Sequence, residues 1–247
     1  MHEILRKVEY PFYLQGSIKD KSNPRDYITD CKFHIHKRII ISEDITNFFD
    51  SIKSDLVFKM WKYFFNFPED VALVLTQLTT YKGFDPQGAS TSSYIANLIF
   101  WDIEPFVVKQ LNEMGICYSR YVDDITLSSE RFITTEDQTF ATSLIYGMLF
   151  KRGVRPNRKK RKVYSSSNRM IVHNLNTNSK KPTLSNEERN NIRAIVKKCE
   201  IMAQSDRYSQ DYIKYYNSAF GKVGKLSRLH KIEGIKLRDR LQEIKPF

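Results

Sequence analysis

The pattern of apolar and polar residues along the first part of the chain predicts an alternation of strands and helices. The β-branched segment RIIISED at residues 38–44 ends in acidic residues, which is typical of a buried strand. Ser54 can cap a helix whose apolar residues follow helical spacing, and a second helix is expected over residues 69–81. A long apolar helix is expected over residues 92–114, and Pro105 should kink it.

Further along, the pattern predicts a hairpin and then more helices. Residues 117–129, CYSRYVDDITLSS, have two β-rich arms around a Val-Asp-Asp centre. A helix near residues 135–151 and short strands near residues 161–166 and 169–175 follow. Ser185, with a glutamate three positions later, forms a capping box that opens a helix, and the rest has an amphipathic helical pattern. Strands grouped around hairpins and followed by helices predict the α+β class, with a helical domain at the end.

Composition narrows the class of protein. The chain has 247 residues, of which 41% are apolar, enough for a packed core in one or two domains. No apolar run approaches the roughly 18–20 residues that a membrane span needs, so no membrane partner is expected. The three cysteines, Cys31, Cys117 and Cys199, have no metal-type spacing and are expected to be reduced thiols in a cytoplasmic protein.

The net charge of +12 is distributed unevenly. Residues 1–150 carry 15 basic and 20 acidic side chains, for −5, whereas residues 151–247 carry 25 basic and eight acidic, for +17. The densest segment, KRGVRPNRKKRK at residues 151–162, has eight cations and no anion. A short basic run is often only a solvated surface. A surplus this extended favours a polyanionic partner, and nucleic acid is the expected one.

Two adjacent carboxylates, Asp123 and Asp124, lie at the centre of the predicted hairpin and follow Tyr121. Adjacent carboxylates repel each other, and divalent cations offset that repulsion because hard cations bind several oxygen ligands. The simpler alternative is a structural turn, in which aspartate is common. Taken alone, the turn supports both interpretations about equally.

Asp44 ends the predicted strand, and Glu43 before it must point to the opposite face of the sheet. If this strand pairs beside the hairpin, Asp44, Asp123 and Asp124 converge at one end of a sheet. Three carboxylates around two metal ions align a 3′-hydroxyl with an α-phosphate for in-line attack. The alternative is that Asp44 caps a helix, since apolar residues follow it at helical spacing.

Residues 86–93, PQGASTSS, precede the predicted long helix. Small residues before a helix let the backbone approach a ligand, and a helix N-terminus favours phosphate. By itself this is a weak signal, because an ordinary turn before a helix has the same composition.

In this combination and order, three segments resemble a known family. DITNFFDSI (44–52), PQGASTSSYIANLIF (86–100) and YVDD (121–124) resemble motifs A, B and C of reverse transcriptases, with bacterial retron and group II intron enzymes as the nearest by pattern. Segments that resemble motif D, the primer grip and the thumb are, in order, GVRPNRKKRK, RMIVHNLNTN and KVGKLSRLHKIEGIKLRDRL. The resemblance therefore extends over nearly the whole chain.

The resemblance implies a polymerase right-hand palm with an antiparallel sheet in residues 1–178, followed by a helical thumb in residues 179–247. It implies an RNA-directed DNA polymerase that extends a primer 3′-hydroxyl with deoxynucleotides (dNTPs) into a DNA product. The expected template is a small structured RNA in a retron-like or antiphage defence system. The alternatives are a template-independent or protein-primed DNA polymerase, and a catalytically idle palm that binds RNA. The presence of all three carboxylates argues against the idle palm.

For the metal site, the resemblance implies that Asp44 and Asp123 are the main ligands of two Mg²⁺ ions, with Mn²⁺ as an alternative. Asp124 is expected to assist them, and the Ile45 carbonyl to line the site. Lys160 is implied as the candidate general acid near the pyrophosphate leaving group.

For the substrates, the resemblance implies that Phe49 is the aromatic gate that excludes a ribose 2′-hydroxyl. Gln87 and Gly88 are expected near the incoming nucleotide and the template. Tyr121 is expected to support the primer end.

Three features depart from the family pattern. Ser90 and Ser93 replace the prolines that are usual in the motif B loop, which leaves its backbone less rigid. His173 and Asn174 stand where retron enzymes commonly have Thr-Gly, and His173 is assigned no role. Few residues precede the Tyr13 segment, where a fingers region with triphosphate-binding cations is usual. We therefore expect a second protein subunit, or self-association, to complete the nucleotide pocket. The alternatives are native N-terminal sequence that this chain omits, and a weak grip on the triphosphate with a high KM.

Overall fold

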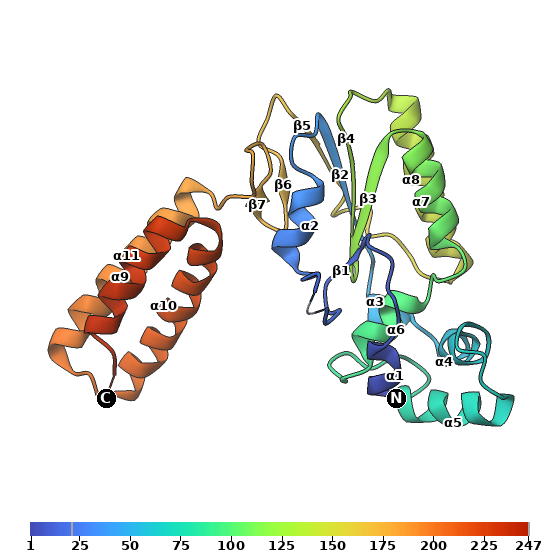
Figure 1. Cartoon of the computed structure of the whole chain (residues 1–247), viewed down its shortest axis with the longest axis horizontal. Helices are drawn as coiled ribbons and strands as arrows, with labels where there is room; N and C mark the ends of the chain where they lie inside the picture. Colours follow the sequence, from blue (N-terminus) through green and yellow to red (C-terminus); the bar gives the residue numbers. More distant parts are fainter. Residues whose placement is uncertain (21, 247) are drawn as a thin grey trace. The chain divides into compact units, whose positions relative to one another are not determined.

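The computed structural model describes residues 1–20 and 22–246 (Figure 1). The chain divides into two compact units, one of residues 1–173 and one that begins at Asn174. The predicted boundary, after residue 178, lies a few residues further along the chain. No helix in the described ranges is long and apolar enough to cross a membrane.

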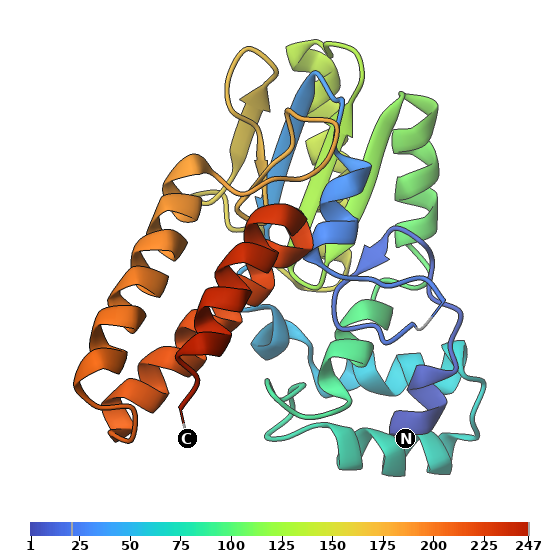
Figure 2. The same ribbon diagram turned by 60° about the vertical axis from the view of Figure 1, so that its left-hand side comes forward.

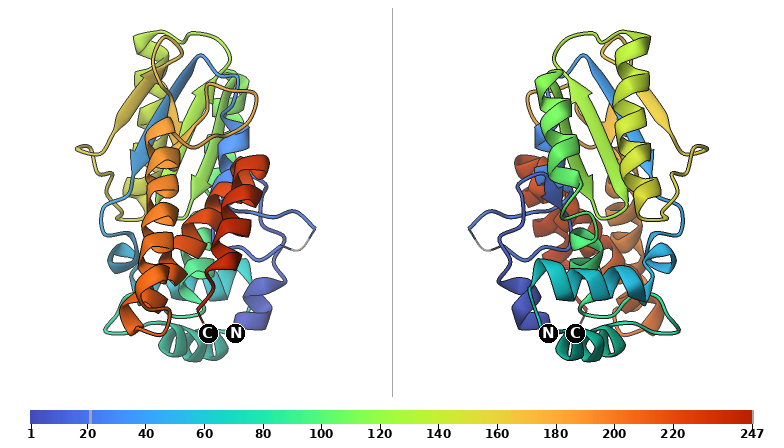
Figure 3. Two further views of the ribbon diagram at one scale, coloured as in Figure 1. Left: turned by 90° about the vertical axis from the view of Figure 1, so that its left-hand side faces the viewer. Right: turned by 90° about the vertical axis from the view of Figure 1, so that its right-hand side faces the viewer.

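A five-stranded sheet forms the centre of the first unit (Figure 2). Its strands, in spatial order, are β1 (Leu14–Gln15), β3 (Ile116–Tyr121), β4 (Asp124–Ser129), β2 (Ile39–Asp44) and β5 (Lys162–Ser165). β1 pairs with β3 in parallel, and the other neighbours are antiparallel. Helices α7 (Glu104–Glu113) and α8 (Thr135–Lys151) cover one face of the sheet, and α2 (Tyr27–Phe33) lies on the other (Figure 3). The predicted α+β class with an antiparallel sheet is confirmed, and the short β1 is a parallel addition.

Burial on both faces explains the composition of β2. Ile39 and Ile41 belong to the main apolar core, and Ile40, on the opposite face, is 0% exposed. A strand that is buried on both faces is a continuous apolar run and does not alternate with polar residues. The predicted strand at residues 38–44 and the predicted hairpin at residues 117–129 are both confirmed.

The predicted single helix over residues 92–114 is wrong. Two helices, α6 (Ser92–Leu98) and α7, form in this segment, and Pro105 lies in the first turn of α7. Proline lacks the backbone N–H that a helix interior needs, but the first turn leaves that donor without an intrahelical partner in any case. Pro105 therefore begins a second helix and does not kink the first.

Ser54 does not cap its helix, which corrects a second prediction. Lys53 occupies the N-cap position, and Ser54 is the first residue of α4 (Ser54–Lys59), with no side-chain capping bond. α4 continues into the π-helical turn η1 (Met60–Phe64), whose Met60 and Trp61 side chains are fully buried. Apolar packing, and not a cap, therefore stabilises this segment.

Other predicted helices of the first unit are present. The remaining elements up to residue 176 are α1 (His2–Arg6), α3 (Phe48–Ser51), α5 (Glu69–Thr79) and the two-stranded sheet of β6 (Ile171–Val172) and β7 (Leu175–Asn176). α5 confirms the helix predicted over residues 69–81, and α8 confirms the one near residues 135–151. The side chain of Thr134 caps α8 by accepting a hydrogen bond from the Asp137 N–H at 3.0 Å.

After β7, the described residues of the second unit form three helices: α9 (Asn186–Ser205), α10 (Gln210–Leu229) and α11 (Lys231–Glu243). As predicted, Ser185 caps α9, because its hydroxyl accepts a hydrogen bond from the Glu188 N–H at 3.0 Å. α10 and α11 approach closely at Gly234, where a Cβ would overlap the Cα of Ser227. Only glycine therefore fits at this position.

His34 is buried against the β3–β4 hairpin. It follows α2, is 0% exposed, and lies 2.7 Å from the hydroxyls of both Ser119 and Ser128. Burial lowers the pKa of His34 to about 4. Between about pH 4 and 6.5, His34 is therefore neutral in the folded protein but protonated in the unfolded chain.

We expect stability to be lost through His34 as the pH falls from about 6.5 to about 4. In this range the unfolded chain takes up a proton that the folded protein does not, so the free energy of unfolding falls by up to about 1.4 kcal/mol per pH unit. Urea unfolding at pH 7, 6 and 5 should show that the difference in the free energy of unfolding between the wild type and His34→Gln narrows as the pH falls. The free energy of unfolding of the exposed control His36→Asn should change with pH as that of the wild type does. If the free energies of His34→Gln and the wild type change in parallel with pH, the prediction is contradicted.

Candidate active site

The Tyr-Val-Asp-Asp turn, residues 121–124, joins β3 to β4. Tyr121 and Asp124 are paired across the hairpin, so only Val122 and the residue after it make the turn. Val122 has a φ of 58°, a left-handed conformation that is costly for a β-branched residue. Burial of Val122 and a hydrogen bond from Arg120 to its carbonyl (3.0 Å) hold this conformation.

Asp44 lies opposite Asp124 in the register of β2 and β4. The Ile45 N–H donates to the Asp123 carbonyl at 3.1 Å, which fastens the end of β2 to the turn. On the other side, the Asn157 N–H donates to the Asp44 carbonyl at 2.7 Å. Backbone hydrogen bonds therefore hold the end of β2 between the turn and the loop that contains Asn157.

The position of Asp44 excludes one of its two interpretations. Asp44 is the last residue of β2, and the N-cap of α3 is Asn47, so Asp44 is not a helix cap. Glu43 lies on the opposite face, as predicted, where it is 2% exposed and accepts hydrogen bonds from Arg161 (2.8 Å) and Tyr146 (3.1 Å). The strand end therefore presents the Asp44 carboxylate separately from that of Glu43.

A cavity of about 350 Å³ opens at this end of the sheet, and both Asp44 and Asp123 line it. Four other residues predicted for the site also line this cavity: Ile45, Phe49, Gln87 and Lys160. The Lys160 ammonium lies 3.1 Å from Oδ1 of Asp44, although the two residues are 116 positions apart in the sequence. The fold therefore brings together residues from motifs A, B, C and D.

Three predicted residues do not line this cavity: Asp124, Tyr121 and Gly88. The Asp124 side chain is 49% exposed, and its Oδ2 lies 3.7 Å from Nδ1 of His173. The Tyr121 ring packs against the His173 imidazole, with their ring centroids 4.7 Å apart. Gly88 is exposed and has a φ of 97°, a conformation that glycine adopts without strain.

The carboxylates at this end of the sheet are poorly compensated. Burial raises the pKa of Asp123, the charge of Asp44 raises it further, and a backbone hydrogen bond and Lys160 lower it. Burial also raises the pKa of Asp124, and His173 opposes that shift. The hydrogen bond to Asp44 raises the pKa of Lys160. In the cavity, the carboxylates of Asp44 and Asp123 therefore share one ammonium, an imbalance that a divalent cation would offset.

The donor atoms in the cavity fit a hard divalent cation. Asp44, Asp123 and Ile45 offer carboxylate and carbonyl oxygens, which such cations prefer. Within the described part of the chain, no three His, Cys, Asp or Glu side chains converge on one point that could hold a metal ion. The structure therefore places two of the three predicted carboxylates in the cavity, with Asp124 beside it.

Sequence reasoning missed two interactions that hold this site. Arg120 is 0% exposed and donates two hydrogen bonds to the Glu104 carboxylate, at 2.6 and 2.8 Å. A cation in the middle of an apolar strand arm is a signal that could have revealed this pair. His173 bonds Asp30, 143 positions away, and no local pattern connects those two residues.

Comparison with known proteins identifies the family. Residues 2–208 match the family described as reverse transcriptase (RNA-dependent DNA polymerase), and the chain belongs to this family. Membership implies the use of a divalent metal.

Two curated retron enzymes are similar to most of the chain. The chain is 37% identical over 247 residues to the retron Se72 reverse transcriptase of Salmonella heidelberg (strain 579083-10), a match that covers 99% of this chain and 64% of that protein. It is 33% identical over 249 residues to the retron Ec48 reverse transcriptase of Escherichia coli, covering 97% and 60%. The predicted resemblance to retron-type enzymes is confirmed, and the chain spans about three-fifths of the length of these relatives.

A solved structure supports the fold alone. Telomerase from Candida albicans, in complex with a TWJ fragment of telomeric RNA, superposes with a TM-score of 0.51 at 11% identity, covering 88% of this chain and 49% of that one. Together with the family match, this likeness confirms the predicted palm fold.

Asp85 lies immediately before the motif B loop and is 0% exposed. Its backbone N–H donates to the Ile52 carbonyl at 2.9 Å, but neither carboxylate oxygen has a hydrogen-bond partner among the described residues. Burial raises the pKa of Asp85 to about 7. Ser92 opposes this shift only in part, because its hydroxyl donates to the Pro86 carbonyl at 2.5 Å.

We expect Asp85→Asn to stabilise the protein at neutral pH. Between about pH 3.8 and 7 the folded protein keeps a proton that the unfolded chain releases, so the wild type loses stability as the pH rises. The variant avoids this loss, which amounts to at most about 1.4 kcal/mol per pH unit. In urea unfolding, the free energy of unfolding of Asp85→Asn should exceed that of the wild type by an amount that grows from pH 4 to pH 7 and is constant above pH 7. The free energy of unfolding of the surface variant Asp55→Asn should change with pH in parallel with that of the wild type. An advantage that does not grow with pH would show that this carboxyl is not held protonated.

Proposed function

We propose that the chain is an RNA-directed DNA polymerase that extends a primer 3′-hydroxyl with deoxynucleotides by two-metal phosphoryl transfer. The observation that carries this proposal is the cavity in which Asp44 and Asp123 meet Lys160. Phosphoryl transfer requires mainly the positioning of the reactants and the neutralisation of charge, and such a site can provide both. Membership of the reverse transcriptase family supports the same chemistry.

Each polar residue of the cavity has a proposed part in this reaction. Asp44, Asp123 and the Ile45 carbonyl would hold Mg²⁺, or Mn²⁺, with Asp124 assisting from the hairpin. When bound, the metal supplies Lewis acidity and aligns the reacting oxygens. Lys160 is the proposed general acid toward pyrophosphate, and its side chain, which is 65% exposed, is free to exchange Asp44 for the leaving group.

The apolar and small residues are proposed to select and place the substrates. Phe49 packs partly against the apolar core and lines the cavity, where its ring would exclude a ribose 2′-hydroxyl. Gln87 lines the same cavity and would face the incoming nucleotide. Apart from Gly88 and its two chain neighbours, no described residue has an atom within 4 Å of the point where a Cβ at Gly88 would be, which leaves room for a nucleotide or template. Tyr121 is the proposed support for the primer end.

RNA is the proposed template, and the product is DNA. The similar curated proteins are retron reverse transcriptases, and a surplus of +17 in residues 151–247 suits a phosphate backbone. A small structured RNA in a retron-like or antiphage defence system, in the cytoplasm, is therefore the setting that we propose. A second subunit that completes the nucleotide pocket stays a prediction.

Primer extension on the protein purified with its RNA tests the proposal. We expect DNA synthesis with dNTPs and Mg²⁺ that EDTA abolishes and that prior RNase treatment removes. Synthesis that persists without RNA would favour a template-independent polymerase, and product linked to protein would indicate protein priming. RNA binding without synthesis, in either Mg²⁺ or Mn²⁺, would contradict the proposal and favour an idle RNA-binding palm.

We expect Asp44→Asn and Asp123→Asn each to reduce synthesis by about 100-fold or more while the fold and RNA binding persist. An amide keeps the shape of the side chain but lacks the charge that attracts a divalent cation. Initial rates on a fixed primer and template, with thermal unfolding and RNA binding measured in parallel, check this. Asp55→Asn, whose carboxylate is 62% exposed, is the control. Wild-type rates in either site variant would remove that residue from the metal site.

We expect Phe49→Ala to admit ribonucleotides. The rejection of a 2′-hydroxyl is steric, and alanine leaves space where the ring was. The ratio of ribonucleotide to deoxynucleotide incorporation should rise by about tenfold or more. Phe106→Ala, which removes a ring that is 69% exposed, should leave the ratio unchanged. If Phe49→Ala discriminates as well as the wild type, Phe49 is not the gate.

A further inference from the structure

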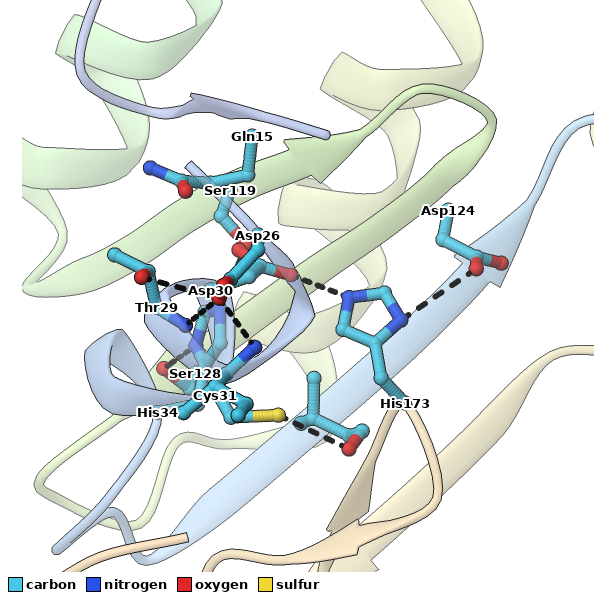
Figure 4. Close-up of polar contacts among 12 residues, drawn as sticks. Gln15, Asp26, Thr29, Asp30, Cys31, His34, Ser119, Asp124, Ser128 and His173 are labelled. Carbon is cyan, nitrogen blue, oxygen red and sulfur yellow. Dashed lines mark hydrogen bonds and ion pairs between the residues drawn. The ribbon is translucent and has the colours of Figure 1, made fainter. Parts of the chain in front are cut away.

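We propose that His173 is a positioning residue for the Tyr-Val-Asp-Asp turn: it links Tyr121 and Asp124, at the two ends of the turn, to the buried carboxylate of Asp30. The importance of this link for catalysis rests on the polymerase function proposed above. His173 lies between β6 and β7, and Figure 4 shows its imidazole between the carboxylates of Asp30 and Asp124.

The backbone conformation fixes the place of the His173 side chain. His173 and Asn174 have φ angles of 48° and 62°, as in the tight turns that join neighbouring strands. Histidine and asparagine adopt this left-handed conformation more readily than most residues do. The His173 side chain is only 11% exposed, so it is packed in the structure and not solvated.

Asp30 provides a buried anchor on α2. Its side chain is 1% exposed, its Oδ2 lies 2.6 Å from Nε2 of His173, and its Oδ1 has no hydrogen-bond partner among the described residues. Because a carboxylate only accepts, Nε2 must carry the hydrogen. Loss of the His173 N–H would leave the buried charge of Asp30 unpaired, so the Asp30 carboxylate holds the His173 ring firmly.

α2 itself is held in place at both ends, so the anchor cannot shift easily. The Asp26 side chain caps its N-terminus by accepting hydrogen bonds from the N–H groups of Ile28 and Thr29, at 2.9 Å each. His34, just after its C-terminus, lies between hydroxyls of β3 and β4. The helix that carries Asp30 is therefore attached to the β3–β4 hairpin, which also contains the Tyr-Val-Asp-Asp turn.

On its other side, His173 faces Asp124. Nδ1 of the ring lies 3.7 Å from Oδ2 of Asp124, too far for a hydrogen bond but near enough for an electrostatic contact. Burial raises the pKa of Asp124, and His173 is the strongest influence against that shift. The His173 ring therefore contacts Asp124 as well as Asp30.

The same imidazole also supports Tyr121. The two rings are 4.7 Å apart between centroids, at an angle of 56°. Tyr121 also packs on Gly16, where a Cβ would lie 2.9 Å from the tyrosine ring. The Asn97 side chain donates to the Gly16 carbonyl at 3.2 Å, which fixes that contact. Without His173, the tyrosine would keep only one of these two supports.

Loss of this link should therefore affect the primer side of the site more than the nucleotide side. Phe49 and Gln87, proposed for the nucleotide, line the cavity, and His173 does not. A displaced Tyr121 or Asp124 would misplace the attacking 3′-hydroxyl without changing the binding of the dNTP. We therefore expect kcat to fall while KM for the dNTP changes little.

His173→Ala and Asp30→Asn test the link from its two ends, and Asn174→Gly is the matched control because glycine keeps the left-handed turn. We expect each test variant to lower kcat for primer extension by about tenfold or more, with KM for the dNTP within about twofold of wild type. The double variant should be within about twofold of the slower single variant, because both changes break the same link. Asn174→Gly should keep the wild-type kcat. If His173→Ala does not fold, His173→Gln replaces it, since glutamine keeps a donor for Asp30 but removes the ring.

Hydrogen exchange at the amides of residues 121–124 gives a readout that needs neither activity nor metal. We expect exchange there to become about tenfold faster or more in His173→Ala and Asp30→Asn, and to stay unchanged in Asn174→Gly. Exchange in α5, on the same unit, should remain at the wild-type rate. A general loss of stability would instead speed exchange in both places.

Three outcomes would overturn the proposal. The first is wild-type kcat and wild-type exchange at the turn in a folded His173 or Asp30 variant. The second is an additive double variant, which would mean that the two residues act independently. The third is an equal acceleration of exchange at the turn and in α5, which would mean that the link only stabilises the fold. If the wild-type protein makes no DNA, the proposed function fails, and the exchange experiment alone still decides whether His173 positions the turn.

Discussion

The rest of the site depends on the hydrogen bonds that the buried guanidinium of Arg120 donates. It bonds Glu104 at the start of α7, the Val122 carbonyl in the Tyr-Val-Asp-Asp turn, and the carbonyls of Ala96 and Asn97 in α6. One side chain thus connects the hairpin to two helices. Removing one partner of a buried ion pair costs about 3–5 kcal/mol, because the other charge is left unpaired. The connection therefore constrains geometry even where its net contribution to stability is small.

The hydrogen bonds of Arg120 explain how a strained backbone and two repelling carboxylates persist at the end of the sheet. Val122 keeps a left-handed backbone because its carbonyl faces Arg120, and Asp123 consequently stays near Asp44, although the charge of Asp44 raises the pKa of Asp123. Folded proteins retain such strain and repulsion where a ligand or a reaction makes use of them. Lys160 relieves one carboxylate, that of Asp44, through an ion pair whose lysine side chain is largely exposed, and such pairs are weak.

Local patterns predicted those parts of the fold that depend on neighbours in sequence. The strand that ends at Asp44 and the hairpin around Asp123 follow from β-branched runs and their alternation, and pairing then places both at one end of the sheet. The break before Pro105 was missed because the apolar pattern is continuous across it, and the proline only shows where a helix can begin. The contact between His173 and Asp30 joins positions 143 residues apart, and only the tertiary fold determines it.

His34 and Asp85 are two buried titratable groups whose effects on stability have opposite signs. Between about pH 4 and 6.5, unfolding takes up a proton at His34 and releases one at Asp85, so the two contributions largely cancel. The wild type can therefore show little dependence on pH from this pair, although both groups are strongly perturbed. The two contributions separate when either group is replaced. The palm thus holds a neutral histidine against its hairpin and an acid with a raised pKa before its motif B loop, and their contributions to the pH dependence of stability offset each other.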